Sequence, residues 1–354
     1  MIQLMKIAVL LSGGVDSSVA LNLIKRDNGH QVTAFYLKIW LEDDLAFLGE
    51  CPWETDLDYA RAVCDQADVP LEIVPLQTKY FEKVVSHAIS ELKAGRTPSP
   101  DILCNQRIKF GEFFKAIGDD YDKVASGHYA QIEAREERFL LKRAPDPVKD
   151  QTYFLSTLSQ AQLSRALFPV GQFHKSEVRA LAEEFNLTTK SRKDSQGICF
   201  LGKIRYDDFV EAYLGEQPGD LIELETGHKW GEHRGYWFYT IGQRRGLGLH
   251  GGPWFVVKKD VEKNIIYISH KEHLEERSRR QFSVSNIHWI AGPPDKNELQ
   301  VKIRHSPQVE ACCIEPLDNG RLGVVLANDE PGIAPGQAAV FYDGEICLGS
   351  GVIE

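Results

Sequence analysis

The chain has 354 residues, of which 43% are hydrophobic, 26% charged and 10% aromatic, a composition typical of a folded globular protein and not of a disordered or fibrous one. No stretch approaches about 18 consecutive apolar residues, and the apolar run at 7–11 is too short for a signal sequence, so we expect a cytoplasmic protein without membrane contact. The formal net charge of -10 argues against a general coat of nucleic acid but leaves room for a local basic groove.

The first 125 residues alternate runs typical of strands with patterns typical of helices. Strands are expected at 6–11, 31–39, 71–75 and 123–125, and helices at 17–26, 56–67, 79–94 and 110–119. Such alternation is the signature of a parallel sheet with helices on both faces. We therefore predict an α/β fold with an N-terminal, Rossmann-like parallel sheet.

The chain changes character after this region. Residues 152–185 follow a helical pattern interrupted at 169–171, and glycine-rich turns separate short β-rich runs from about residue 206. Between 282 and 342, short alternating runs separated by turns predict a closed or nearly closed β-barrel. We therefore predict an α/β domain over 1–205, a small β-rich central domain over 206–276 and a C-terminal β-barrel over 277–354.

The segment SGGVDSS (12–18) joins the first predicted strand to the first predicted helix. Its glycines allow the backbone to approach a ligand closely, and Asp16 and Ser17 stand where the N-cap of the helix is expected. The free N–H groups and the dipole of that helix favour an anion. Because the segment lacks the lysine of a Walker A loop and the third glycine of a dinucleotide fingerprint, we expect another kind of nucleotide phosphate site. A glycine turn that only caps a helix is the alternative.

Two cysteines lie near groups that activate thiols. Cys104 stands near the end of a proline-containing loop (97–105), three residues after Asp101 and close to the start of an expected helix at 108–116, whose dipole lowers a thiol pKa. Cys199 follows three bases and a glycine, and cations stabilise a thiolate or a persulfide. If the two thiols meet, they can resolve a covalent sulfur intermediate by forming a disulfide. Taken singly, each is also compatible with a structural role.

The remaining cysteines, at 51, 64, 312, 313 and 347, form no CxxC pair and no spacing with histidine that suits zinc. Packing is favoured over catalysis for them, and we expect neither zinc nor an iron–sulfur cluster. His128 follows the strand at 123–125, at the end of the sheet where open α/β folds bind ligands. By itself it is equally typical of a polar loop residue.

Seven motifs follow one another over almost the whole chain: SGGVDSS at 12, TPSPDILCNQRIKF at 97, ASGHYA at 125, KDQTYFL at 149, KDSQGICF at 193, TIGQRRGLG at 240 and PGQAAVFYDGEICLGSG at 335. The first resembles the pyrophosphate loop of the ATP pyrophosphatases, which adenylate a carbonyl or carboxyl group. Together the motifs resemble the tRNA-specific 2-thiouridylase family. Its members adenylate the C2 oxygen of the wobble uridine in tRNAs for Lys, Glu and Gln and then replace that oxygen with sulfur.

The resemblance implies a role for each matching residue. ATP with Mg²⁺ is expected at Leu10, Leu11, Ser12, Gly13, Gly14, Val15, Asp16 and Ser17, with Leu37 and Gly127 near the adenosine. Cys199 is implied to carry a persulfide, Cys104 to resolve it through a transient disulfide, and Asp101 to act as acid and base near the target uridine. Contacts with tRNA are implied for Ser99, Pro100, Asp101, His128, Lys149, Asp150, Gln151, Arg304, His305 and Gln337. A protein of a persulfide relay is the expected sulfur donor.

Three positions depart from the family pattern. Leu37 replaces the more usual Met, an exchange that conserves volume. Ser99 stands where many members have Asn, and 304–306 reads Arg-His-Ser instead of Arg-Tyr-Arg, which is expected to alter one stacking ring and one phosphate contact. The basic stretches 186–205 and 277–304 offer a surface for the tRNA while its target base is splayed out of the anticodon loop.

Two competing functions remain compatible with the residues. One is an amidating enzyme of the same superfamily that acts on a small molecule and needs no pair of cysteines. The other is a nucleic-acid-binding or scaffold protein whose nucleotide loop is only regulatory. Loss of activity in both Cys104→Ser and Cys199→Ser would argue against the amidating enzyme. Release of AMP and pyrophosphate from ATP that depends on tRNA and sulfur would argue against the binding or scaffold protein.

Overall fold

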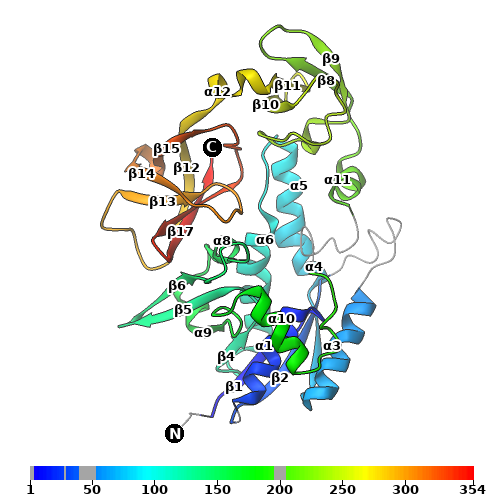
Figure 1. Ribbon diagram of the computed structural model, residues 1–354, viewed down its shortest axis with the longest axis vertical. Coiled ribbons are helices and arrows are strands. Elements are labelled where there is room, and N and C mark those ends of the chain that lie inside the picture. The colour runs from blue at the N-terminus through cyan, green and yellow to red at the C-terminus, as the bar shows by residue number, and fades with distance from the viewer. Residues whose placement is uncertain (1–3, 28, 40–52, 195–204) are drawn as a thin grey trace.

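The computed structural model describes residues 4–27, 29–39, 53–194 and 205–354 (Figure 1). Its strands form a five-stranded, a four-stranded and an eight-stranded sheet. In Figure 1 the first of these lies at the bottom of the molecule, the second at the top, and the third to the left. Among the described residues, no helix is both long and apolar enough to cross a bilayer.

The N-terminal sheet is parallel throughout, with strand order β3-β2-β1-β4-β7, which confirms the predicted architecture. Its strands are β1 (Lys6–Leu10), β2 (Gln31–Lys38), β3 (Leu71–Pro75), β4 (Lys123–Ala125) and β7 (Ala166–Leu167). The strand order reverses between β1 and β4, and such a reversal opens a crevice at the carboxyl ends of the two strands. The sheet thereby places the loops after β1 and β4 side by side.

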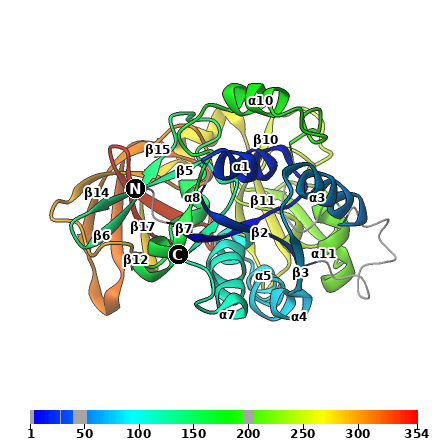
Figure 2. The ribbon, with the colours of Figure 1, turned by 90° about the horizontal axis from the view of Figure 1, so that it is seen from below.

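Helices cover both faces of this sheet (Figure 2). Ile7 and Val9 belong to one core with α3, whereas Ala8 and Leu10 belong to another on the opposite face, as the two-residue period of a strand requires. One face carries α1 (Val15–Arg26), α3 (Trp53–Ala67) and α10 (Lys175–Glu184). The other carries α4 (Gln77–Tyr80), α5 (Ser86–Lys93) and α7 (Phe113–Ile117); the short helices α8 (Thr152–Leu155) and α9 (Gln160–Arg165) follow later in the chain.

The helix that carries Cys104 begins earlier than expected. α6 (Pro100–Leu103) continues without a break into a π-helical segment (Cys104–Glu112) and then into α7. Pro100 occupies a first-turn position, where its missing N–H has no partner to lose and its fixed φ favours the helix. The prediction of a loop over 97–105 is therefore wrong beyond Ser99, and Cys104 lies one turn inside a helical run.

A hairpin that the sequence analysis missed links the first sheet to the barrel. β5 (Ala130–Arg135) and β6 (Arg138–Arg143) pair antiparallel, and β6 then pairs with the last strand of the chain. Dense charges in this stretch mask the alternation of a strand. The consequence is that a segment far from the C-terminus in sequence extends the C-terminal sheet.

The central part of the chain is β-rich, as expected, but it opens with a helix that was not predicted, α11 (Tyr206–Leu214). Its strands are β8 (Gly219–Glu223), β9 (Lys229–His233), β10 (Trp254–Asp260) and β11 (Ile265–His270), in the order β10-β11-β8-β9. The short helix α12 (Leu274–Arg277) leads from this sheet to the barrel.

The C-terminal strands close into a six-stranded antiparallel barrel, which confirms the prediction. They are β12 (Arg279–Trp289), β13 (Glu298–Lys302), β14 (Glu310–Pro316), β15 (Leu322–Glu330), β16 (Ala338–Asp343) and β17 (Ile346–Ile353). Pairing of β12 with both β15 and β17 closes the ring. Cys312 and Cys347 are buried, whereas Cys313 is exposed because adjacent residues of a strand point to opposite faces.

Close contact between Gly171 and the hairpin yields a stability prediction. A methyl group at Gly171 would lie 1.6 Å from the carbonyl oxygen of Ala130, so Gly171→Ala must displace the backbone at the start of β5. We expect it to lower the free energy of unfolding by about 1–3 kcal/mol. Gly231→Ala, where nothing lies within 4 Å of the new methyl, is the control and should leave that free energy unchanged. Urea titration followed by circular dichroism measures both; equal stabilities would contradict the packing argument.

Candidate active site

The SGGVDSS segment forms the turn between β1 and α1. Gly14 is the N-cap of α1, so the expectation that Asp16 or Ser17 caps this helix is wrong. The hydroxyls of Ser17 and Ser18 instead donate to the carbonyl of Gly14, at 3.1 and 2.7 Å. Because a glycine N-cap has no side chain to accept from the first turn, the helix N-terminus keeps its capacity for an anion.

Two glycines let this turn lie against its neighbours. Gly13 has a φ of +72°, and a methyl group there would lie 2.2 Å from the carbonyl oxygen of Asp56 on α3. Gly127, after β4, approaches so closely that a methyl group would lie 2.6 Å from the backbone nitrogen of Ser17. The loops after β1 and β4 therefore touch through backbone atoms, as the reversal of strand order allows.

A cavity of about 360 Å³ opens between these loops. It gathers nearly all of the residues expected to bind the nucleotide and several expected to act on the tRNA. The expected residues that line it are Leu10, Leu11, Ser12, Gly14, Val15, Asp16, Ser17, Leu37, Cys104, Gly127, His128, Lys149 and Gln151. Side chains from β1, β2, the Cys104 helix and the loop after β4 thus converge on one space.

Cys104 is fully buried, and the cavity is lined by it together with Ile108 and Lys109 of the same π-helical segment. Asp101 lies one turn earlier, in the first turn of α6. Cys199 and the rest of 195–204 lie outside the described residues. The structure therefore brings one of the two expected thiols to the nucleotide loop.

Three charged residues beside the cavity, Asp194, Lys175 and Arg179, were not singled out by the sequence analysis. Asp194 accepts from Lys149, Lys175 and Arg179 at 2.5, 2.9 and 2.5 Å. Lys175 also donates to Asp16 at 2.6 Å. Lys175 and Arg179 are one turn apart on α10, and only that i, i+4 spacing could have marked them, since their partners are distant in sequence.

Arg192 ties the chain that leads to Cys199 to the phosphate loop. Its guanidinium donates to the carbonyl of Gly13 at 2.7 Å and to the carboxylate of Asp56 at 2.6 Å. It also lies over the ring of Tyr59, 4.3 Å from the centroid. The basic stretch at 186–205 thus contributes to the cavity through a residue that the sequence analysis did not single out.

Two pKa shifts describe the electrostatics of the cavity. Burial alone would raise the pKa of Asp194, but hydrogen bonds from Lys149 and Lys175 outweigh it and lower the pKa to about 2. Burial, assisted by the charge of Lys109, lowers the pKa of His128 well below its usual value. His128 packs between Phe110 and Phe168, and its Nδ1 lies 2.8 Å from the Ser126 hydroxyl. A neutral imidazole and an ionised carboxylate therefore flank the cavity.

The other expected tRNA contacts lie elsewhere. Ser99 lines a second cavity of about 460 Å³ between α5, α6 and the barrel, and the residues on either side of Gln337 line it too. Arg304 pairs with Glu330 at 3.0 Å. His305 lies against the ring of Phe154, with 4.7 Å between the ring centroids. These residues border the junction of the N-terminal unit and the barrel.

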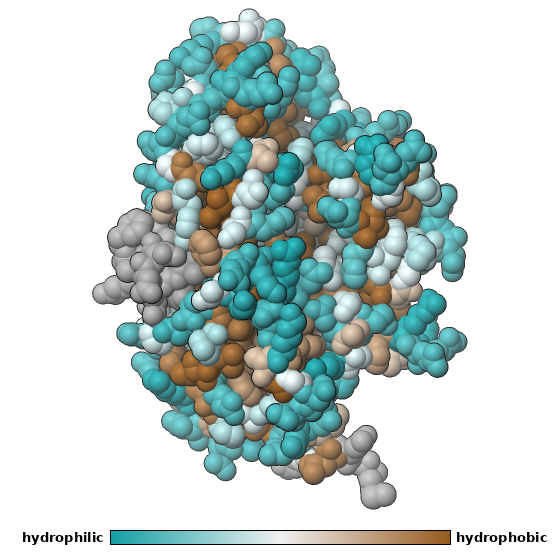
Figure 3. All heavy atoms as spheres, turned by 180° about the vertical axis from the view of Figure 1, so that it is seen from behind, coloured by the Kyte–Doolittle hydropathy of each residue, from teal (hydrophilic) through white to brown (hydrophobic). Residues whose placement is uncertain are grey.

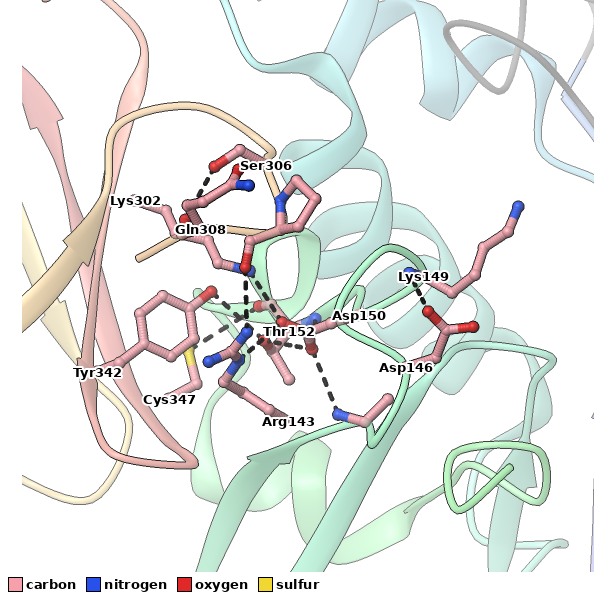
Figure 4. A network of polar contacts seen from close by, with 12 residues as sticks. Arg143, Asp146, Lys149, Asp150, Thr152, Lys302, Ser306, Gln308, Tyr342 and Cys347 are labelled. Carbon is pink, nitrogen blue, oxygen red and sulfur yellow. Dashed lines mark hydrogen bonds and ion pairs between the residues drawn. The ribbon is translucent and has the colours of Figure 1, made fainter. Parts of the chain in front are cut away.

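Asp150 is the exception among the expected tRNA contacts, because its side chain is fully buried. Its carboxylate accepts from Lys302 at 3.0 Å and from Arg143 at 3.2 Å (Figure 4). In this arrangement the carboxylate has no surface to offer to an RNA, whereas its neighbours Lys149 and Gln151 do reach the nucleotide cavity. The three residues of the KDQ motif therefore face different surroundings.

Comparison with protein-family models matches almost the whole chain. Residues 5–203 match the model described as "tRNA methyl transferase HUP domain", 207–270 the "tRNA methyl transferase PRC-barrel domain" and 279–353 the "Aminomethyltransferase beta-barrel domain". The first of these covers the unit that holds the phosphate loop. The three matched ranges follow the chain in the same order as the parallel sheet, the four-stranded sheet and the barrel.

Curated relatives are similar over their full length. The chain is 47% identical over 356 residues to tRNA-specific 2-thiouridylase MnmA 1 of Bacteroides thetaiotaomicron, covering 99% of each chain. It is 45% identical over 357 residues to tRNA-specific 2-thiouridylase MnmA of Parabacteroides distasonis, again covering 99% of each. A solved structure of U34-tRNA thiolase NcsA from Methanococcus maripaludis is 18% identical, with a TM-score of 0.35 over 58% of this chain and 65% of that one. With a parallel sheet, a phosphate loop and a cysteine at one cavity, and with relatives this similar from end to end, the chain belongs to the tRNA-specific 2-thiouridylase family.

Proposed function

We propose that the chain is a tRNA-uridine 2-sulfurtransferase, which uses ATP to adenylate the C2 oxygen of the wobble uridine and replaces that oxygen with sulfur. The observation that carries the proposal is the single cavity lined both by the phosphate loop and by Cys104. Membership of the thiouridylase family supports the choice of tRNA as substrate over a small molecule. The protein works in the cytoplasm, on tRNAs for Lys, Glu and Gln.

ATP binds with its phosphates at the N-terminus of α1 and its adenosine near Leu37 and Gly127. Lys149, Lys175 and Arg192 surround this place with positive charge, and each is paired with a carboxylate in the structure. A triphosphate carries more negative charge than any one of those carboxylates, so the cations can turn to it. Asp16 at the cavity is an oxygen donor suited to Mg²⁺, which supplies charge that neutralises the phosphate oxygens.

Adenylation converts a poor leaving group, the uridine oxygen, into AMP. The target base must leave the stacked anticodon loop to reach the buried Cys104, at a cost of a few kcal/mol in stacking. Asp101, one helical turn before Cys104, moves the proton that accompanies this exchange at its carboxylate. The buried position of Cys104 keeps bulk water from competing with sulfur for the activated carbon.

The sulfur arrives on Cys199 as a persulfide delivered by a relay protein. The thiolate of Cys104 attacks the Cys199 sulfur, a Cys104–Cys199 disulfide forms, and hydrosulfide leaves. The hydrosulfide then attacks C2, and AMP departs with the oxygen. A thiol reductant, such as the relay protein, regenerates both cysteines. Cys199 is five residues after Asp194, which lines the cavity. A fully extended chain of that length spans at most about 18 Å, so Cys199 stays within that distance of Asp194.

The tRNA is held by residues of more than one unit. We propose contacts for Ser99, Pro100, Asp101, His128, Lys149, Gln151, Arg304, His305 and Gln337. We also propose the division into units at 1–205, 206–276 and 277–354, the last two serving mainly to bind tRNA. An unstacked base next to His305 would add to the ring contact that His305 already makes with Phe154.

Replacing either cysteine tests the chemistry. Cys104→Ser and Cys199→Ser should each lower formation of 2-thiouridine at least 100-fold, because a hydroxyl neither carries a persulfide nor resolves one. Both variants should still release pyrophosphate from ATP in the presence of tRNA. Cys313→Ser, at an exposed cysteine of the barrel, is the control and should retain full activity. Nucleoside analysis of digested tRNA measures the product, and thiolation by either active-cysteine variant would sink the sulfur-transfer step.

Lys175 tests the phosphate site. Lys175→Met removes the cation that pairs with Asp16 and Asp194, two residues that line the cavity, and we expect the KM for ATP to rise about 10–100-fold, equivalent to about 1.4–2.8 kcal/mol. Lys175→Arg, which keeps the charge, should recover part of the loss. Lys115→Met, at an exposed lysine that pairs with Glu112, is the control. An unchanged KM for ATP in Lys175→Met would remove this residue from the phosphate site.

His128 gives a pH-dependent prediction. Its folded-state pKa lies below that of the unfolded chain, so below about pH 6.5 the unfolded state binds a proton that the folded state does not. Stability therefore falls on the acid side, by up to about 1.4 kcal/mol per pH unit for this one group. His128→Asn removes this titrating group and should therefore reduce the slope by up to about 1.4 kcal/mol per pH unit. His250→Asn, at an exposed position, is the control. Urea unfolding at pH 7.5 and 5.5 measures the slopes; identical slopes in wild type and His128→Asn would contradict the buried neutral imidazole.

A further inference from the structure

A cluster of buried charges lies where the N-terminal unit meets the barrel (Figure 4). Asp150 comes from the connection between β6 and α8, and Lys302 from the end of β13 in the barrel. Both side chains have no exposed surface, and Lys302 Nζ lies 3.0 Å from Asp150 Oδ2. Arg143, at the end of β6, donates to the same oxygen at 3.2 Å. Lys302 thus pairs with the buried carboxylate of a residue about 150 positions earlier in the sequence.

The remaining polar groups of the cluster are also satisfied. The second oxygen of Asp150 accepts from the hydroxyl of Thr152 at 2.9 Å and from its backbone N–H at 3.3 Å. The Thr152 hydroxyl lies 3.3 Å from the hydroxyl of Tyr342 on β16. Lys302 lies over the ring of Tyr342, 5.3 Å from the centroid. Such a network costs desolvation and adds little net stability, but it admits only one arrangement of its members.

The same residue holds the barrel a second time through its backbone. The carbonyl oxygen of Asp150 lies 3.1 Å from Nε2 of His305, three positions after Lys302. Asp150 therefore contacts the barrel both at the end of β13 and in the loop that follows it. That loop carries Arg304 and His305, two of the three barrel residues proposed to contact tRNA.

On its other side Asp150 is joined directly to the nucleotide cavity. Lys149 points away from the cluster in Figure 4 and pairs with Asp194 at 2.5 Å. The side-chain oxygen of Gln151 accepts from the backbone N–H of Tyr129 at 2.9 Å, at the start of the hairpin. One three-residue segment thus connects the ATP-binding cavity with the tRNA-contacting loop of the barrel.

We propose that Asp150 and Lys302 are positioning residues, which set the barrel loop at 304–305 in register with the nucleotide cavity so that bound tRNA presents its target base to Cys104. This assigns Asp150 a role without RNA contact, and it rests on the proposed tRNA thiolation. The exposed pair Lys296–Asp343, 2.7 Å apart on the same barrel, holds nothing across the junction and serves as a matched comparison. A pair that only stabilised the barrel would affect ATP and tRNA binding alike.

The test compares Lys302→Met, Asp150→Asn and the double variant with wild type and Lys296→Met. For each protein, we would first measure thiolation of tRNA, the cooperativity of thermal unfolding and ATP binding without RNA. We expect the affinity for tRNA to fall at least tenfold in Lys302→Met and Asp150→Asn, with ATP affinity within twofold of wild type. Asp150→Asn is nearly isosteric and remains informative if Lys302→Met folds poorly. Lys296→Met should match wild type in every measurement.

The salt dependence of tRNA binding distinguishes positioning from contact. A lost phosphate contact lowers the slope of log K against log salt by about one, whereas a lost positioning residue leaves the slope unchanged. We expect Lys302→Met to keep the wild-type slope and Arg304→Met to lower it. Wild-type tRNA affinity in both single variants, a lower slope in Lys302→Met, or equal losses of ATP and tRNA binding would each overturn the proposal. Absence of thiolation by the wild-type protein would instead overturn the proposed function.

Discussion

The approach of Gly127 to the backbone nitrogen of Ser17 is the contact on which the rest of the site depends. It exists because β1 and β4 are neighbours in a parallel sheet whose order reverses between them. The reversal leaves a crevice, and Gly127 allows its two rims to meet without a side chain between them, while Gly13 lets the phosphate loop lie against Asp56 of α3. The cavity at the N-terminus of α1, where we propose that ATP binds, therefore has protein on both sides, and Cys104, Ile108 and Lys109 line it as well.

Four cations and three carboxylates gather around this crevice. A protein with a net charge of -10 collects Lys149, Lys175, Arg179 and Arg192 at one place and balances them with Asp16, Asp56 and Asp194. The balance keeps the cations ordered, because isolated like charges at this spacing would repel one another. It also gives the chain that approaches Cys199 two fixed points, at Arg192 and Asp194, beside the phosphate loop.

The barrel is attached to the α/β unit through more than a linker. The hairpin β5–β6 adds two strands to the barrel sheet, and the Asp150 cluster lies just beyond the end of that hairpin. Backbone pairing fixes the direction of the barrel strands, and the buried ion pair fixes their position along that direction. A tRNA that contacts both parts, as we propose, would bind across a junction whose two sides keep a fixed arrangement.

Local patterns in the sequence by themselves determined the parallel sheet, the phosphate loop and the barrel, because a two-residue period, glycine spacing and helix start signals act over a few residues. They did not reveal the start of the helix at Pro100, the hairpin at 130–143 or the burial of Asp150. The cations of α10 were missed for the same reason as Lys302. The burial of Asp150 and the cations of α10 depend on partners that folding brings from about 150 residues away, and only the tertiary structure decides which charges meet.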